Sequence, residues 1–303
     1  MILIFGIYNR SGTNYLFDLL RLHPQCAITQ TELWEDYLLA HTDIIEDYIR
    51  QTQKHWNKDW YENAPILRKQ LYKSLSEVLQ QSAPAQEHEQ ILSKTPSTLC
   101  IDKVFDVFPQ AHVIVIVRNA KAVVESGVKS FNWKYENALR IWHQSALRIL
   151  RFREKNEHFL LVKYEDLFSD TTTKLQEILQ FCKLDATKYN WDAMKKLPIR
   201  GSSTLTQKTD KVHWQAVEKT ANFNPLARAN HWSRWQNYRY HWLCAETEKA
   251  LGYKIEPIAK SPLYYSYNVL ADAYHKTRFF WHKLKLIAKS SRQIFASNPF
   301  AGK

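Results

Sequence analysis

The 303-residue chain has little cysteine, little glycine and no long hydrophobic run. Its four cysteines lie far apart and form no CxxC pair or Cys/His cluster, so neither a zinc site nor a disulfide framework is predicted. The longest apolar stretches, 1–8 and 113–117, have the length of a strand and are far too short to span a bilayer. No charged leader or cleavage site is visible, so we expect no signal peptide and a location in the reducing cytoplasm.

Acidic residues are also scarce relative to basic ones. The chain has 30 Asp and Glu against 42 Lys and Arg, a net charge of +12 with the histidines neutral. This balance favours an anionic partner, such as a nucleotide, a nucleic acid, an acidic glycan or a membrane surface. Hydrophobic residues make up 45% of the chain, which excludes global disorder and leaves enough apolar sequence for a substantial core.

Short apolar segments alternate with amphipathic ones along most of the chain. Strands are predicted at 2–7, 90–94, 111–117 and 159–162, and helices at 14–22, 36–56, 66–81, 120–128, 136–155 and 171–181. This alternation predicts an α/β fold in three layers, with a central parallel sheet flanked by helices. The segment 198–235 is polar and weakly periodic, which predicts loops over a site. We expect one domain over residues 1–256 and a basic, helical C-terminal tail over residues 257–303.

A tight polar loop, Asn9-Arg10-Ser11-Gly12-Thr13, joins the first predicted strand to a helix. The first N–H groups of a helix are unpaired and bind anions. Gly12 lets the main chain approach a phosphate, while Ser11 and Thr13 add hydroxyl donors. The GxxxxGK[ST] pattern needs a lysine where Thr13 stands, which argues against a grip on a γ-phosphate and its magnesium. Taken alone, the segment also fits an ordinary strand-to-helix turn.

A second candidate clamp follows the buried strand at 113–117. Arg118 stands at the carboxyl end of that strand, where ligands bind in open α/β sheets, and Ser126 lies eight residues further on the next helix. Arginine offers a planar fork to a phosphate and serine a hydroxyl. The alternative is a solvated arginine at a strand end.

Together these two segments resemble the nucleotide signature of sulfotransferases that use 3′-phosphoadenosine 5′-phosphosulfate (PAPS). In that family an RSGT-type loop binds the 5′-phosphosulfate, and an Arg with a Ser eight residues on binds the 3′-phosphate. The resemblance implies a P-loop-like fold, PAPS as the donor, its desulfated product PAP, and no required metal. Further matches follow over residues 1–240, in the family's order: Leu19-Leu20…His23-Pro24, Ser93-Lys94-Thr95-Pro96, Phe108-Pro109-Gln110-Ala111 and Val162-Lys163-Tyr164-Glu165-Asp166-Leu167.

The resemblance also implies which residues bind the donor. Tyr164 matches a family tyrosine near the adenosine, although a packed aromatic at the strand end is an alternative. Arg200 and Ser202 match a late loop that closes on the nucleotide. The full set of donor-binding candidates is Arg10, Ser11, Gly12, Thr13, Asn14, Arg118, Ser126, Tyr164, Arg200 and Ser202.

Sulfuryl transfer needs a base for the acceptor hydroxyl and cations at the departing nucleotide. The resemblance implies Lys94, together with Arg10, for the second role. Small-molecule sulfotransferases carry a His where Pro96 stands here, so the pattern is closer to the tyrosylprotein and carbohydrate members, whose base is a Glu beyond the first helix. Glu32 fits that base; Glu35 and an unidentified His are the alternatives.

The resemblance leaves the acceptor open. The basic charge and 11 tryptophans suit a glycan or glycolipid, a lipid or small molecule is also possible, and no nucleic-acid partner is expected. A phosphoryl-transferring kinase and a non-catalytic nucleotide-binding module are the other two hypotheses. After Asp272 the tail has cations beside aromatics, which predicts either a helix at the inner face of the membrane or a helix packed on the catalytic domain.

Overall fold

A computed structural model of the chain describes residues 1–28, 35–83, 89–200, 218, 225–226 and 232–296, with the backbone alone at 279 and 282–296. The chain divides into two units. One comprises residues 1–231 and 243–254, and the other comprises residues 232–242 and 255–303.

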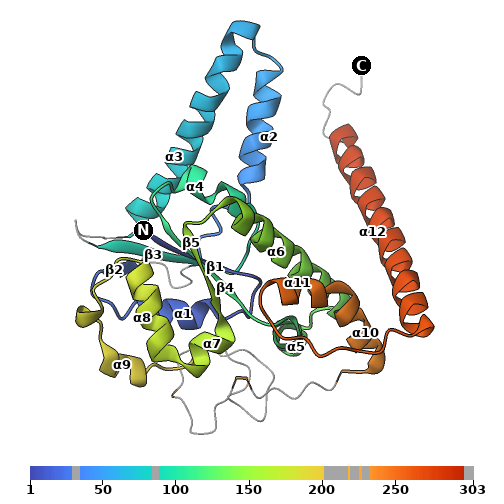
Figure 1. The fold of residues 1–303 in the computed structure, drawn as a ribbon. Helices are drawn as coiled ribbons and strands as arrows, with labels where there is room; N and C mark the ends of the chain where they lie inside the picture. Colours follow the sequence, from blue (N-terminus) through green and yellow to red (C-terminus); the bar gives the residue numbers. More distant parts are fainter. Residues whose placement is uncertain (29–34, 84–88, 201–217, 219–224, 227–231, 297–303) are drawn as a thin grey trace. The chain divides into compact units, whose positions relative to one another are not determined.

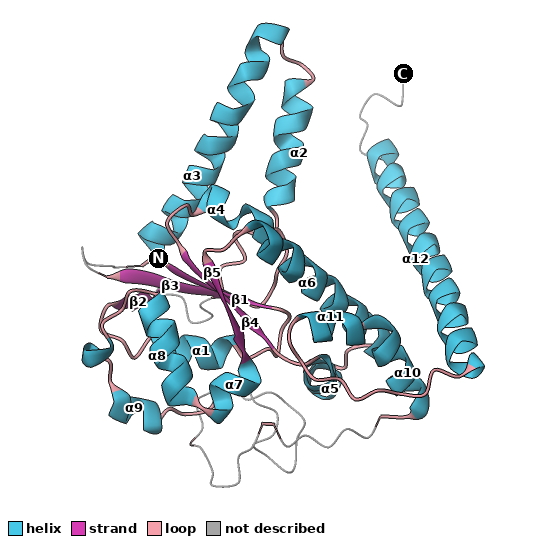
Figure 2. Cartoon of the chain, viewed as in Figure 1, coloured by secondary structure: helices cyan, strands magenta, loops and turns pink. Residues whose placement is uncertain are grey.

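The first unit is built on a parallel sheet of five strands (Figure 2). The strands are β1 (Ile2–Gly6), β2 (Cys26–Ile28), β3 (Gln90–Thr95), β4 (His112–Val117) and β5 (Phe159–Lys163), in the spatial order β2-β3-β1-β4-β5. Every residue of β1 is buried, because helices cover both faces of the sheet. The chain leaves β1 toward one edge and later returns to the other side at β4, so the carboxyl end of β1 is the switch point at which ligands bind in such sheets.

Helices form the two outer layers of this unit (Figure 1). The helices α1 (Thr13–Leu20), α7 (Tyr164–Ser169) and α8 (Thr171–Phe181) pack on one face, in a core that includes Ile4 and Ile116. The helices α5 (Ala120–Phe131), α6 (Tyr135–Lys155) and α11 (Ala245–Ala250) lie on the other face. The three-layer α/β fold predicted from the sequence is therefore confirmed.

Two local predictions differ from the structure. The short edge strand β2 was not expected, and the helix expected from residue 36 begins only at Thr42, as α2 (Thr42–Gln53). Asp36 accepts a hydrogen bond from the Leu38 N–H at 2.9 Å, and Tyr37 has a φ of 48°. This side-chain turn and the left-handed residue are incompatible with a helix, so residues 36–41 remain irregular.

The remaining helices of the first unit are short, apart from one hairpin. Helix α2 pairs with α3 (Ala64–Ser82), and Arg68 holds them together through hydrogen bonds of 2.8–3.1 Å to Glu46. The turn η1 (Lys58–Asn63) joins the two helices, and the other short elements are η2 (Ile101–Lys103), α4 (Val104–Val107), η3 (Ala186–Lys188) and α9 (Trp191–Lys195).

The second unit contains α10 (Arg234–Leu243), except for its last residue, and α12 (Pro262–Ala296). The C-terminal tail is therefore helical, as predicted. Over the described residues, no helix combines the length and the apolar character needed to cross a lipid bilayer.

Candidate active site

The loop between β1 and α1 is shaped by two glycines. Gly12 precedes the first turn of α1 with a φ of 101°, and a Cβ at this position would lie 2.2 Å from Cδ2 of Tyr164. A Cβ at Gly6 would lie 2.6 Å from Oγ of Ser11. Only glycine fits either position. No side chain of a described residue caps α1, so its first N–H groups can serve as anion donors.

Arg118 is buried at the carboxyl end of β4, and its guanidinium is held from several sides. Nη1 donates to the carbonyl oxygen of Arg10 at 3.1 Å, and Nη2 donates to the carbonyl oxygen of Pro225 at 3.0 Å. The guanidinium carbon lies 4.4 Å from the ring centroid of Tyr164. Nε has no hydrogen-bond partner among the described residues. Two of the five N–H donors of Arg118 are thus used by backbone carbonyl groups, which fixes the guanidinium in place.

Arg10 connects the loop after β1 to helix α5. Its Nε donates a hydrogen bond of 3.0 Å to Oγ of Ser126, which is fully buried. The guanidinium carbon also lies 5.4 Å from the centroid of the Phe131 ring. The two segments predicted to bind the two phosphate groups of the donor therefore meet at one point.

Helix α5 is anchored by residues that were not singled out in the sequence. The Asn119 side chain caps the helix by accepting from the Ala122 N–H at 2.8 Å, and it donates to Oε1 of Glu165 at 2.6 Å. Asn directly after a strand is a recognisable helix-capping signal. Glu165 comes from α7, so this contact sets the position of Ser126 relative to Tyr164.

Lys94 is buried on β3, beside the first turn of α1. Its Nζ donates to Oδ1 of Asn14 and, at 3.0 Å, to Oε1 of Glu35. Burial lowers the pKa of Lys94, and the negative charge of Glu35 opposes that shift. The ion pair with Glu35 thus favours the charged form of Lys94, which burial alone would disfavour.

Glu35 is a described residue of the segment that follows β2. It accepts hydrogen bonds from Lys94 and, at 3.1 Å, from the hydroxyl of Tyr37. The favoured base from the sequence, Glu32, lies outside the described residues, and so does Ser202. Of the two candidate carboxylates, the structure thus shows Glu35 within hydrogen-bond distance of Lys94.

Arg200 contacts a residue that the sequence had not suggested. Its Nε donates to Oδ2 of Asp18 at 3.1 Å, its Nη2 donates to Oδ1, and Arg21 pairs with the same carboxylate at 3.1 Å. Burial raises the pKa of Asp18, while Arg200 and then Arg21 oppose this shift. Asp18 therefore ties the late loop containing Arg200 to α1.

Several of these side chains line one cavity in the first unit, but Lys94, Glu35 and Ser126 are not among its described lining residues. Its wall includes four cations, Arg10, Arg118, Lys195 and Arg200, but among its described residues only one acid, Asp18, which is itself paired with Arg200. Tyr15, Tyr164 and Phe168 supply aromatic surface. Excess positive charge beside aromatic rings suits a ligand that carries phosphates and a planar base.

This arrangement defines a nucleotide-binding α/β enzyme of the P-loop-like class, with the loop after β1 at the switch point of the sheet. Residues 2–188 match the model of the sulfotransferase family, so the chain belongs to that family and is a sulfotransferase. The prediction from the sequence motifs is confirmed.

Comparison with curated proteins finds no match. Among solved structures, the sulfotransferase domain of the Synechococcus PCC 7002 olefin synthase is 20% identical, with 84% of this chain and 95% of that one covered and a TM-score of 0.49. The sulfotransferase domain from the curacin biosynthetic pathway is 16% identical (84% and 98% covered, TM-score 0.46). Mouse sulfotransferase SULT7A1, complexed with PAP, is 14% identical (90% and 88% covered, TM-score 0.43).

Proposed function

We propose that this sulfotransferase moves the sulfonate group of PAPS to a hydroxyl group of a glycan or glycolipid and releases PAP. The observation that carries the proposal is the meeting of Arg10, Arg118 and Ser126 at the carboxyl ends of β1 and β4. Family membership supports the reaction class, and the cationic, aromatic cavity supports a nucleotide donor.

In this proposal the donor is bound from two sides. Arg118 and Ser126 bind the 3′-phosphate, which is supported by the Nε of Arg118, an N–H donor with no partner among the described residues. The loop residues Arg10 to Asn14 and the N-terminus of α1 bind the 5′-phosphosulfate. Tyr164 lies against the adenosine, and Arg200 with Ser202 closes the site. Arg118 stacks on Tyr164, and both residues line the cavity. This supports binding of the 3′-phosphate and the adenine base side by side in that cavity.

The proposed chemistry is an in-line attack on sulfur. Glu32 takes the proton of the acceptor hydroxyl while its oxygen forms a bond to sulfur. The bond from sulfur to the bridging oxygen breaks, and the electron pair leaves with the phosphate of PAP. Lys94 and Arg10 stabilise the negative charge on that phosphate. No metal takes part in this proposal.

Glu35 is better suited to a positioning role than to the role of base. Both oxygens of its carboxylate already accept a hydrogen bond, Oε1 from Lys94 and Oε2 from the hydroxyl of Tyr37. This supports Glu32 as the base and assigns to Glu35 the task of keeping Lys94 charged.

The net charge of +12 supports an acceptor that carries negative charge, and the abundant tryptophan supports a sugar. We place the reaction in the cytoplasm, on the cysteine spacing of the sequence. A kinase is the second hypothesis, and the threonine at position 13 argues against it because a P-loop kinase needs a lysine there.

The test is transfer of labelled sulfonate from PAPS to a panel of glycans, glycolipids, phenols and tyrosyl peptides, with a chelator present throughout. We expect transfer to a glycan or glycolipid, and a loss of at least about 100-fold in turnover for Lys94→Ala. Lys69→Ala, which changes an exposed lysine on α3, is the matched control. Transfer to phenols or peptides alone would correct the acceptor, and magnesium-dependent phosphoryl transfer without sulfonate transfer would overturn the reaction.

A further inference from the structure

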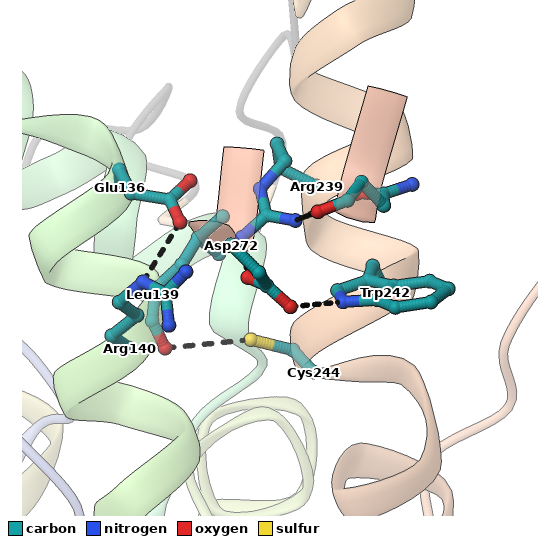
Figure 3. Close-up of polar contacts among 8 residues, drawn as sticks. Glu136, Leu139, Arg140, Arg239, Trp242, Cys244 and Asp272 are labelled. Atoms are coloured by element: carbon teal, nitrogen blue, oxygen red, sulfur yellow. Dashed lines mark hydrogen bonds and ion pairs between the residues drawn. The ribbon is translucent and has the colours of Figure 1, made fainter. Parts of the chain in front are cut away.

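The second unit holds α12 against α10 through one side of the long helix (Figure 3). Buried Arg239 donates to Oδ1 of Asn268 at 2.8 Å and to Oδ1 of Asp272 at 2.8 Å. Trp242 donates from Nε1 to the other carboxylate oxygen of Asp272, also at 2.8 Å. Tyr264 is buried on the same side of α12 and packs edge-on against Tyr238. These contacts fix which side of α12 remains open.

The open side carries large apolar residues on a single line. They follow one another at intervals of seven, four and seven residues, close to whole turns of a helix with 3.6 residues per turn. All are strongly exposed, Leu270 at 70% and Trp281 at 63%. We define this exposed stripe as Leu263, Leu270, Tyr274 and Trp281. Val269 and Phe280 are also exposed on α12, about 100–120° around the helix from this line.

The charge beside the stripe has one sign. After Asp272 the sequence has no acidic residue up to its last residue. Lys276 and Arg278 are exposed on α12 itself. The remaining cations of this stretch are Lys283, Lys285, Lys289, Arg292 and Lys303. An apolar line of leucine and aromatic side chains flanked by cations is typical of helices that lie in the interface of an anionic membrane.

We propose that α12 binds along the surface of an anionic lipid bilayer. The exposed stripe enters the boundary between headgroups and acyl chains, and the cations contact the negatively charged headgroups. The helix lies along the bilayer rather than across it, because it is not apolar enough to span one. Charge favours this occupant over a second copy of the chain, because two equally basic helices would repel each other. The inference does not depend on sulfonate transfer.

The experiment is co-sedimentation of the full chain with neutral vesicles and with vesicles containing about one third phosphatidylserine, at low and high salt. We expect binding to the anionic vesicles at low salt and its loss at high salt. The double variant Lys276→Gln/Arg278→Gln should lower the partition coefficient about 10- to 30-fold. Lys69→Gln/Lys73→Gln, on α3, removes the same total charge elsewhere and should have a much smaller effect.

The stripe is tested in the same way. Leu270→Gln/Trp281→Gln should lower binding at least about tenfold, because each side chain loses its favourable burial. Ile66→Gln/Val78→Gln is the control, because both residues are exposed apolar side chains on α3. Circular dichroism checks that each variant is folded. Absence of binding, equal binding to neutral vesicles, or equal losses in variant and control would each overturn the proposal. Self-association abolished by the stripe variant, without vesicle binding, would identify a second copy as the occupant instead.

Discussion

The indole Nε1 of Trp142 donates a hydrogen bond of 3.0 Å to the backbone carbonyl oxygen of Arg118. Trp142 is fully buried on α6, so this bond fixes the end of β4 from one side of the sheet. Tyr164 contacts the Arg118 guanidinium from α7, on the other side. The proposed 3′-phosphate contact is therefore held in place before the donor binds, which lowers the ordering cost of binding.

Removal of the Arg118 guanidinium should weaken donor binding more than any other single change at the 3′-phosphate. Arg118→Ala deletes a charge-assisted contact and should cost about 2–4 kcal/mol of binding free energy, roughly 30- to 1000-fold in Kd. Arg118→Lys keeps the charge without the planar fork and should recover only part of the loss. Calorimetry with PAP measures both variants.

Arg50→Ala is the control, because Arg50 is an exposed arginine on α2. Its Kd for PAP should equal that of the wild type. A folded Arg118→Ala variant with wild-type affinity would show that the 3′-phosphate binds elsewhere.

The two candidate carboxylates should differ in how they affect turnover. Glu32→Gln removes the proposed base while keeping its size, so kcat should fall roughly 10²- to 10⁴-fold with PAP affinity near normal. Glu35→Gln should have a smaller effect near neutral pH, because Lys94 keeps its hydrogen bond to Asn14. Single-turnover rates with saturating donor compare the two variants. The reverse order of effects would make Glu35 the base.

Glu35 should instead control the pH dependence of the reaction. Burial lowers the pKa of Lys94 and Glu35 opposes this, so Glu35→Gln should lower the pKa further. Lys94 acts as a cation, and the alkaline fall in kcat should therefore begin at a lower pH in the variant than in the wild type. Glu77→Gln, which removes the partner of exposed Lys73, should leave the pH profile unchanged.

The same shift has a consequence for stability. A lysine whose pKa is lower in the folded than in the unfolded chain destabilises the fold at low pH, and the penalty fades as the pH rises from the folded value toward 10.5. Glu35→Gln enlarges this penalty. Its deficit in unfolding free energy should be greatest near neutral pH and should shrink in alkaline buffer. Denaturant unfolding at several pH values measures it, and a deficit that grows with pH would contradict the assignment.

Most of the sheet could be predicted because its strands are buried on both faces and form unbroken apolar runs, as in Val113 to Val117. β2 could not, because its three residues pair only at the edge, with β3. The predicted start of α2 was wrong because hydrophobic periodicity does not register the turn at Asp36. The same carboxylate accepts a hydrogen bond from the Ser93 hydroxyl on β3, a contact that only the tertiary fold provides.

The site shows the same division between local and long-range information. The loop at Gly12 and the pair Arg118 and Ser126 could be predicted, because each motif is local in sequence. The pairing of Asp18 with Arg200 could not, since 182 positions separate the two residues and only the tertiary fold brings them together. The roles of all the site residues stay predictions, and Glu32 and Ser202 also lie outside the described residues.

Substitution of Gly12 tests the shape of the loop after β1. Gly252 serves as the control, because both glycines have a positive φ but only at Gly12 would a Cβ overlap an aromatic ring. Gly12 has a φ of 101° and no room for a Cβ, which would lie 2.2 Å from the Tyr164 ring. Gly252 has a φ of 87°, but the nearest atom to a Cβ there is Nζ of Lys163, the far end of a long side chain, at 3.0 Å. Gly252→Ala should therefore lose only the free energy needed to hold an alanine in a left-handed conformation, about 1–2 kcal/mol of unfolding free energy. Gly12→Ala should cost about 1–3 kcal/mol more.

The two variants should also differ in function. In Gly12→Ala the displaced Tyr164 ring can no longer support the Arg118 guanidinium, so we expect PAP affinity to fall at least about tenfold, while Gly252→Ala keeps it. Tyr164→Ala removes the ring that a Cβ at position 12 would overlap, but it leaves the backbone strain at that position. The loss of unfolding free energy caused by Tyr164→Ala should therefore be smaller in the Gly12→Ala background than in the wild type. Thermal unfolding and PAP calorimetry on all four variants complete the cycle. Equal stability losses in the two glycine variants, with additive effects of Tyr164→Ala, would mean that the ring does not set the shape of the loop.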